Sequence, residues 1–426
     1  MIRQFAWTTT VLSLFLSGYA LCDEWSLKAN VDQNLGYDDN VCMLPDNATG
    51  NVLCGQGRQR GSFKYMITPV LTFQHRTDTS NVSAHAIYGT QMYTDIPGFD
   101  QDFQSYGINS VYNTETIDWG LDWNYSITPT RNTAATESGR FDNRSDRNSW
   151  SISPTATFKL DEVNSFIVTP SYSETFFDKT AGDPGNNFFN DNKNYAINMA
   201  WQHLWSERFL SGVSFFYNRF ESQIQVNDVD ENGQPIVSTL PSAFDNFGIN
   251  FANTYLISDN WKLTAVVGGR YTESEIGDER DTNIGFLADT SISYTGENFT
   301  AGLNFMRGLT PSTFGQLQEQ TSVGLNFSYK VLEKLSTGLN FNYQESTTTG
   351  FVPNSFNNFG NRTNFVIEPS VSWQFARDWT LGGSYRYRFQ DVDQQGGVIG
   401  LFAGEADSNL FMISINYNWQ GISVSK

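Results

Sequence analysis

Residues able to do chemistry are few in this sequence and lie far apart. The three histidines, His75, His85 and His203, are isolated along the chain, and neither a Gly-x-Ser-x-Gly elbow nor a His-Glu-x-x-His pair is present. Such motifs bring a nucleophile and its base, or two zinc ligands, within reach of each other. Their absence from the sequence predicts a protein that is not an enzyme and needs no cofactor.

One short stretch has the character of a metal site. Asp228-Val229-Asp230-Glu231-Asn232-Gly233 resembles the first half of a calcium loop, in which alternating side-chain oxygens precede a glycine. The twelfth position, where a bidentate glutamate closes such a loop, is Thr239. The preferred interpretation is therefore a polar turn made by Asn232-Gly233. Asp228, Asp230 and Asn232 are kept as weak calcium candidates, and no other metal site is expected.

The first residues follow the pattern of a secretory signal peptide. Arg3 supplies a positive start, residues 11–16 form a short apolar core, and Ala20-Leu21-Cys22 places small residues where a signal peptidase reads them. We therefore expect residues 1–22 to be removed and residues 23–426 to form the mature protein. A lipoprotein with a lipid on Cys22 is the weaker reading, because Leu21 is large for the position before such a cysteine.

Export also bears on the remaining cysteines. Cys42 and Cys54 lie in one predicted loop, and oxidising compartments retain disulfides. We expect the two to pair, the alternative being two free thiols in the loop.

The elements that would position all these residues are β-strands. In residues 410–419, Phe411, Ile413, Ile415, Tyr417 and Trp419 alternate with mostly polar residues, so one face of an extended strand is apolar. The pattern recurs along the chain, with tight turns and long polar stretches in alternation. This rhythm is typical of a transmembrane β-barrel with lipid outside and water inside.

The predicted barrel is an all-β, antiparallel, up-and-down barrel of about eighteen strands, wide enough for an aqueous lumen. The long connections are expected at residues 130–148, 177–193, 221–244, 346–362 and 391–407. The clearest strand is 117–129, where Asp118 and Asp122 share a face that must turn away from lipid. This choice fixes the register, because a slip by one residue would exchange the two faces.

Charged residues fall on the lumen side of the predicted strands. The pore-lining candidates are Lys262, Arg270, Arg386, Arg388, Asp118, Asp122, Asp289 and Glu368. Rings of charge in a pore select ions by sign, and the arginines would favour anions. The alternative is cross-strand ion pairing that stiffens the wall.

The composition limits the partners. The chain has 426 residues and a formal net charge of −19, which does not suggest a nucleic-acid partner. Aromatic residues reach 15 %, as expected where they form girdles at the two water–lipid boundaries. The expected partners are the lipid of a Gram-negative outer membrane and the barrel-assembly machinery.

The stretch Gly36-Tyr37-Asp38-Asp39-Asn40-Val41 resembles the start of the β-barrel porin type 2 family. Trp379-Thr380-Leu381-Gly382-Gly383-Ser384-Tyr385-Arg386-Tyr387 and Ser408-Asn409 are similar to its closing segment. The resemblance implies an outer-membrane barrel that takes part in exopolysaccharide export, with polysaccharide and periplasmic export components as partners, and it supplies no catalytic residues. The alternatives are a general or solute-selective diffusion porin and, disfavoured, an outer-membrane hydrolase.

Overall fold

The computed structural model describes residues 23–45, 61–134, 141, 145–178, 189–229, 235–348, 361–393 and 404–425. Eighteen strands and two short 3-10 helices, η2 (Pro97–Phe99) and η3 (Thr130–Asn132), account for most of these residues. The strands are β1 (Glu24–Asp38), β2 (Ser62–Arg76), β3 (Ser80–Tyr93), β4 (Gln101–Asn113), β5 (Ile117–Pro129), β6 (Asp146–Lys159), β7 (Asn164–Phe177), β8 (Asn192–Ser206), β9 (Phe209–Val229), β10 (Pro235–Leu256), β11 (Trp261–Ile276), β12 (Glu279–Thr295), β13 (Phe299–Pro311), β14 (Leu317–Leu332), β15 (Leu335–Thr348), β16 (Arg362–Ala376), β17 (Trp379–Val392) and β18 (Gly404–Ser425). The expected signal segment lies outside the described residues.

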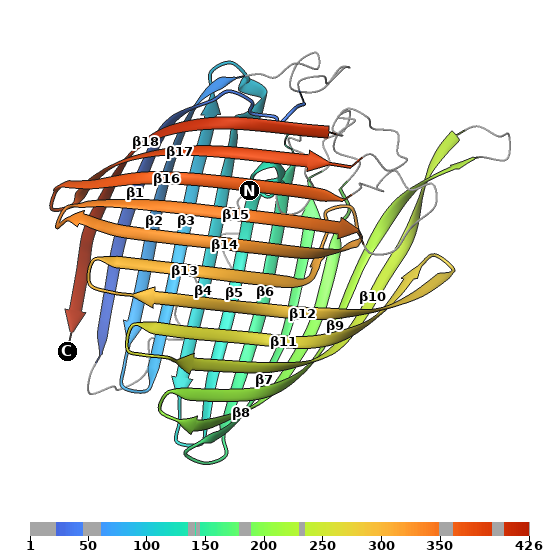
Figure 1. The fold of residues 1–426 in the computed structure, drawn as a ribbon, viewed down its shortest axis with the longest axis horizontal. Helices are drawn as coiled ribbons and strands as arrows, with labels where there is room; N and C mark the ends of the chain where they lie inside the picture. Colours follow the sequence, from blue (N-terminus) through green and yellow to red (C-terminus); the bar gives the residue numbers. More distant parts are fainter. Residues whose placement is uncertain are drawn as a thin grey trace, which may run out of the picture.

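The strands form one closed antiparallel barrel (Figure 1). Each strand pairs with the next along the chain, and β1 pairs with both β2 and β18, which closes the ring. Because Glu24 lies opposite Ser425, β1 begins and β18 ends at the same rim, where the tight turns are. The predicted fold class is confirmed. No helix in the described part of the chain is long and apolar enough to cross a membrane.

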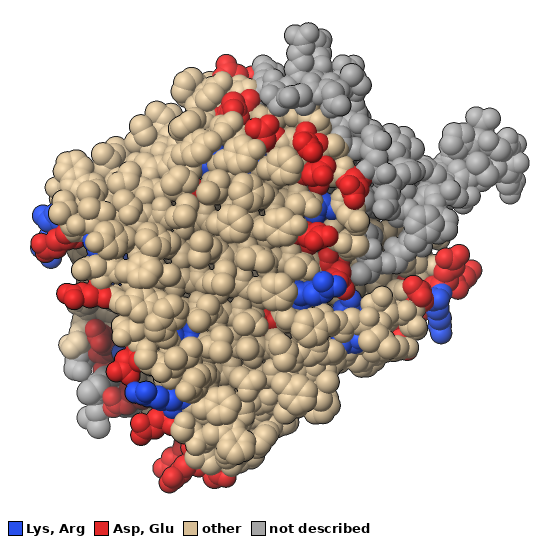
Figure 2. Space-filling model, viewed as in Figure 1, with Lys and Arg blue, Asp and Glu red and all other residues tan. Residues whose placement is uncertain are grey.

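The outer surface carries the apolar face of the strands. In β18, Phe411, Ile413 and Ile415 are exposed, whereas Met412 and Ser414 between them are half-buried. Large apolar side chains are exposed in the same way around the barrel, an arrangement that is stable only against lipid. Figure 2 shows one side of this surface as mostly uncharged, with charged residues gathered towards the two ends.

One expected loop is a pair of strands. Residues 221–244 were predicted as a polar connection, but most of them belong to β9 and β10, which pair as far as Val229 and Pro235. The reason is that the polarity reverses at this end. Phe220, Ile224 and Phe244 are buried, whereas Glu221 is on the other face and more exposed. A strand that has left the membrane turns its polar face outward, so its sequence looks like a loop.

Small buried clusters lie at the end of the barrel with the long connections. The cluster beside β3 consists of Val41, Cys42, Leu44, Tyr93, Ile96 and Phe99. These residues come from the segment after β1, the end of β3 and the connection that follows it, so they join two connections and the end of a strand into one packed unit.

Candidate pore

The inner face of the wall can be identified from contacts that cross the barrel. Phe220 of β9 and Phe244 of β10 pack against Leu317 of β14, although three strands separate β14 from β10 in the ring. Only residues inside the ring can meet in this way. Because side chains alternate along each strand, this fixes the inward face of every strand in register with β9 and β10.

Two predicted acidic residues lie on the inward face of β5 and are both partnered. The Asp118 carboxylate lies 2.6 Å from Nζ of Lys159, and the Asp122 carboxylate accepts a hydrogen bond of 2.6 Å from Nδ2 of Asn109. Each partner belongs to an adjacent strand, β6 for Lys159 and β4 for Asn109. The Asp118–Lys159 contact is a cross-strand ion pair of the kind that the alternative describes, whereas Asp122 bonds to a neutral amide.

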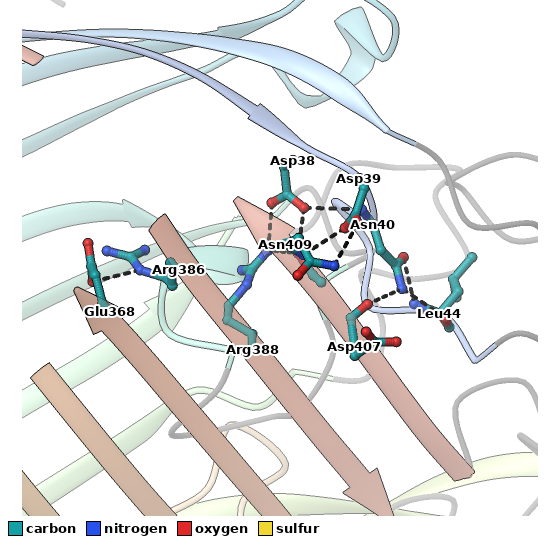
Figure 3. Close-up of polar contacts among 10 residues, drawn as sticks. Asp38, Asp39, Asn40, Leu44, Glu368, Arg386, Arg388, Asp407 and Asn409 are labelled. Carbon is teal, nitrogen blue, oxygen red and sulfur yellow. Dashed lines mark hydrogen bonds and ion pairs between the residues drawn. The ribbon is translucent and has the colours of Figure 1, made fainter. Parts of the chain in front are cut away.

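The predicted arginines of β17 also face carboxylates. Nε of Arg386 donates to Glu368 at 2.9 Å, and Nη2 of Arg388 donates to Asp38 at 2.6 Å (Figure 3). The pairing with Glu368 joins two residues that had been predicted on the same wall. Asp38 is not among the predicted pore-lining residues, and its role as a partner depends on the closure of β1 onto β18, which no local pattern reveals.

Arg270 is the most deeply buried of the predicted pore residues. It is 3 % exposed and donates to Thr272, Asn283 and Glu319, the last at 2.9 Å. Arg307 contacts the other oxygen of the same Glu319 carboxylate. Glu319, the acidic partner of Arg270, is not among the predicted pore-lining residues.

Lys262 and Asp289 remain solvent-exposed. Lys262 lies opposite Ser293 near the tight-turn rim, and Asp289 lies opposite Val266 and Met306. Neither forms an ion pair with another described residue. The structure therefore places the predicted charges in several separate pairs around the wall instead of one cluster, and the predicted anion selectivity stays a prediction.

The Asp38-Asp39-Asn40 motif joins the first strand to the last two (Figure 3). The Asp38 carboxylate accepts hydrogen bonds from Ser408 and Arg388, and the Asp39 carboxylate accepts two from Asn409. Every one of these partners lies on β17 or β18. The motif that carries the family resemblance therefore closes the barrel at its long-connection end.

Asn40 completes this seam. It is 1 % exposed, its Nδ2 donates to the carbonyls of Asp407 and Leu44, and its Oδ1 accepts from the Leu44 amide. The Asn40 side chain therefore stabilises the turn after β1 and joins this turn to Asp407 of β18.

The tip of the β13–β14 hairpin leaves the ring of strands. β12 begins at Glu279 and β13 continues to Pro311, but the two pair only through residues 288–295 and 300–307. β13 and β14 stay paired with each other as far as Pro311 and Leu317. The part of the β13–β14 hairpin beyond Arg307 and Thr321 can therefore bend away from β12 as one unit.

The turn at 312–316 reaches the inner wall at β10 and at the β7–β8 connection. The amide of Asn190 donates to the Thr313 carbonyl at 2.8 Å, and the Ser242 hydroxyl donates to the Gly315 carbonyl at 3.1 Å. Phe314 packs on Phe189, their ring centroids 5.8 Å apart. These partners belong to the β7–β8 connection and to β10, so the turn lies inside the barrel mouth.

The faces in contact confirm this geometry. Arg307, Leu309 and Glu319 would face outward if the hairpin stayed in the ring, because they share the side of Phe305 and Val323. Instead Glu319 meets the inward-facing Arg270, and Leu309 packs on the inward-facing cluster of Phe220 and Phe244. The outer side of the hairpin tip therefore lies on the inner side of β9–β11.

Gly315 fits the tip closely against β9. Its φ is +82°, and a Cβ atom there would lie 2.1 Å from the carbonyl oxygen of Gln223. Only glycine adopts this conformation and this close approach without strain.

Other predicted sites are only partly described. Cys42 is buried and disulfide-bonded, and Cys54 lies outside the described residues, so their pairing stays a prediction. Asp228 lies near the end of β9, whereas Asp230 and Asn232 lie outside the described residues. The described residues contain no group of three or more His, Cys, Asp or Glu side chains that could hold a metal ion.

Comparisons with known proteins give a likeness in fold. No family model and no curated protein matches the chain. OccAB4 of Acinetobacter baumannii is 10 % identical with a TM-score of 0.45, over 95 % of this chain and 99 % of that one. The outer membrane channel DcaP of the same organism is 15 % identical with a TM-score of 0.41, over 93 % and 97 %. The ferric-catecholate import receptor Fiu of E. coli K12 is 11 % identical with a TM-score of 0.44, over 92 % and 81 %.

The architecture itself defines the class of protein. A closed, even-numbered antiparallel barrel with an apolar exterior and a polar inner wall is a porin-type β-barrel of the outer membrane. Membership of the β-barrel porin type 2 family stays a prediction from short motifs.

Proposed function

We propose that this barrel is a channel for polar, largely uncharged solutes, and that its cargo is an exopolysaccharide leaving the cell. The observation that carries the proposal is the chemistry of the inner wall. Its strands present mostly hydroxyl and amide side chains inward, for example Asn304, Asn326 and Ser328 on β13 and β14. Such groups exchange hydrogen bonds with sugar hydroxyls at little net cost, because each bond to water is replaced by one to the wall.

The ion pairs support the same proposal. Arg270, Arg386 and Arg388 each contact a carboxylate, so a passing solute meets little unbalanced charge at these positions. The exopolysaccharide itself is inferred from the family resemblance. Asp38, Asp39 and Asn40 join β1 to β17 and β18. This motif therefore closes the barrel, and it gives no information on the transported molecule.

A second function, diffusion of small solutes, is favoured by the β13–β14 hairpin. The turn at 312–316 lies inside the barrel mouth and reduces the width available to a solute. A narrowed mouth suits single sugars and short oligosaccharides, and it also suits one extended glycan strand.

Liposome swelling with the reconstituted protein tests the channel. We expect glucose and linear maltodextrins to permeate at rates that fall with length, and gluconate and glucosamine to permeate no faster than glucose. The absence of swelling with every sugar would contradict the channel, and a strong preference for either charged sugar would contradict the neutral wall. Export is tested in the source bacterium, where deletion should abolish secreted exopolysaccharide and leave uptake of small sugars unchanged if export is the main role.

A further inference from the structure

Three basic residues gather at the long-connection end of the inner wall. Lys64 of β2 and Arg131 of η3 both lie over the ring of Tyr93, with Nζ of Lys64 5.7 Å and Cζ of Arg131 4.5 Å from its centroid. Arg388 of β17 is near enough to act electrostatically on both. Asp38 pairs with Arg388, and Asp100 accepts a hydrogen bond of 2.7 Å from the Tyr93 backbone amide, so the three basic side chains outnumber these two carboxylates.

Arg131 is buried, and its terminal nitrogens lack well-aligned hydrogen bonds. It is 5 % exposed and stacks between Tyr93 and Phe99, whose centroids lie 4.5 Å and 4.6 Å from Cζ. The ring faces attract the cation but accept no strong hydrogen bond. Neither Nη1 nor Nη2 forms a well-aligned hydrogen bond with a described residue, and the Tyr93 side chain is the one polar group near enough to act on the guanidinium as a weak partner among those residues. Burial lowers the pKa of Arg131 below its ordinary value, and the positive charge of Arg388 acts in the same direction.

Gln91 is a second buried polar side chain on the inner wall without hydrogen bonds. It lies two residues before Tyr93 on the inward face of β3 and is fully buried. Neither its Oε1 nor its Nε2 has a partner among the described residues. Buried polar groups are nearly always hydrogen-bonded, and leaving one unpaired costs about 1–3 kcal/mol. Gln91 and Tyr93, the residue on which Arg131 stacks, lie on the same face of one strand, and two such unpaired side chains there point to a missing polar ligand.

We propose that Arg131, Lys64 and Gln91 form a binding site for an oxyanion, the carboxylate of an acidic sugar. The two terminal nitrogens of Arg131 match the two oxygens of a carboxylate, the Lys64 amine adds a further N–H donor, and the Gln91 amide can both donate to and accept from a neighbouring hydroxyl. The site goes beyond passage through a neutral wall, since it would hold one end of an acidic solute at the mouth.

Calorimetric titration of the whole folded protein in detergent at low ionic strength tests the site. The probes are glucuronate, glucose and inorganic phosphate. We expect glucuronate to bind and glucose not to bind. Phosphate binding as well would assign the site to oxyanions in general, whereas no glucuronate binding, or equal binding of glucose, would overturn the proposal. Because no transport is measured, a protein that fails to conduct but binds glucuronate would contradict the proposed channel and leave this site standing.

Matched variants distinguish a ligand site from a purely structural cation. Arg131→Gln should weaken glucuronate binding at least tenfold, whereas Arg280→Gln removes the same charge from an exposed ion pair with Glu275 and should change nothing. Gln91→Leu provides a second readout, because it removes a buried amide without removing charge. We expect it to weaken glucuronate binding several-fold without lowering thermal stability. If Arg131→Gln does not fold, unchanged binding by Gln91→Leu would by itself contradict the proposed role of Gln91.

Discussion

The Asn40 side chain links the segment after the first strand to the last strand. This side chain satisfies backbone groups of Leu44 and Asp407, which are far apart in sequence. Asn40→Ala would leave these groups buried and unpaired, so we expect the unfolding free energy to fall by about 1–3 kcal/mol. Urea unfolding from liposomes measures it. Asn34→Ala is the control, because the Asn34 side chain makes no hydrogen bond with a described residue, and an equal loss of stability in both variants would contradict the role of Asn40.

Asp161 gives a prediction about pH in the turn between β6 and β7. Hydrogen bonds from the side chain of Asn164 and from the backbone amides of Val163 and Asn164 hold the pKa of this carboxyl below its ordinary value. Its contribution to the turn is therefore present above the ordinary pKa, near 3.9, and is lost as the pH falls through the lower folded value. A proton NMR titration of the Asn164 side-chain amide should report a midpoint below that of a model peptide; a midpoint at or above it would refute the turn geometry.

At the scale of the element, β5 tests the register. Trp123 lies on the outward face with the exposed Trp119, and Asn124 lies on the inward face with Asp122. Trp123→Arg should cost about 2–4 kcal/mol if the position lies near the bilayer midplane, because a cation would face lipid. Asn124→Arg should cost much less, because its side chain faces water. Similar unfolding midpoints for the two variants in liposomes would show that the faces are exchanged.

The sequence allowed the strands to be predicted wherever they cross the membrane. In these segments every second side chain must be apolar because it faces lipid, as Phe411, Ile413 and Ile415 do. Beyond the membrane the apolar side chains face inward and the polar ones face outward. The outer parts of β9 and β10 therefore resemble a loop in sequence, although the buried Phe220 and Ile224 lie on one face of β9.

The partners of the charged residues were harder to predict. The ion pair of Arg386 with Glu368 follows from neighbouring strands in register. The partners of Arg388 and Arg270 do not, because Asp38 arrives through closure of the ring and Glu319 arrives through the bend of the β13–β14 hairpin. Arg131 and Gln91 belong to no sequence motif. Their candidate role follows only from burial of polar atoms that lack well-aligned hydrogen bonds, which the sequence does not reveal.

At the scale of the molecule, two features set the width of the channel. The seam formed by Asp38, Asp39 and Asn40 keeps the ring closed, and the turn at 312–316 occupies part of its mouth. The turn is fastened at both ends, by Asn190 and Ser242 at the tip and by the Arg270–Glu319 pair at its base. A channel built in this way should become wider when the tip is displaced and the seam is left intact.

The most direct test is single-channel conductance of the wild type and of Gly315→Val in planar bilayers. A side chain at Gly315 would collide with the Gln223 carbonyl and would have to adopt a positive φ, so the tip should leave the wall. Gly404→Val is the matched control, because Gly404 also has a positive φ, +108°, but nothing lies within 4 Å of its Cβ position. We predict open channels for all three proteins, with a larger conductance and passage of longer maltodextrins for Gly315→Val alone. A wild type that never opens, or a Gly315→Val channel identical to Gly404→Val, would contradict the account.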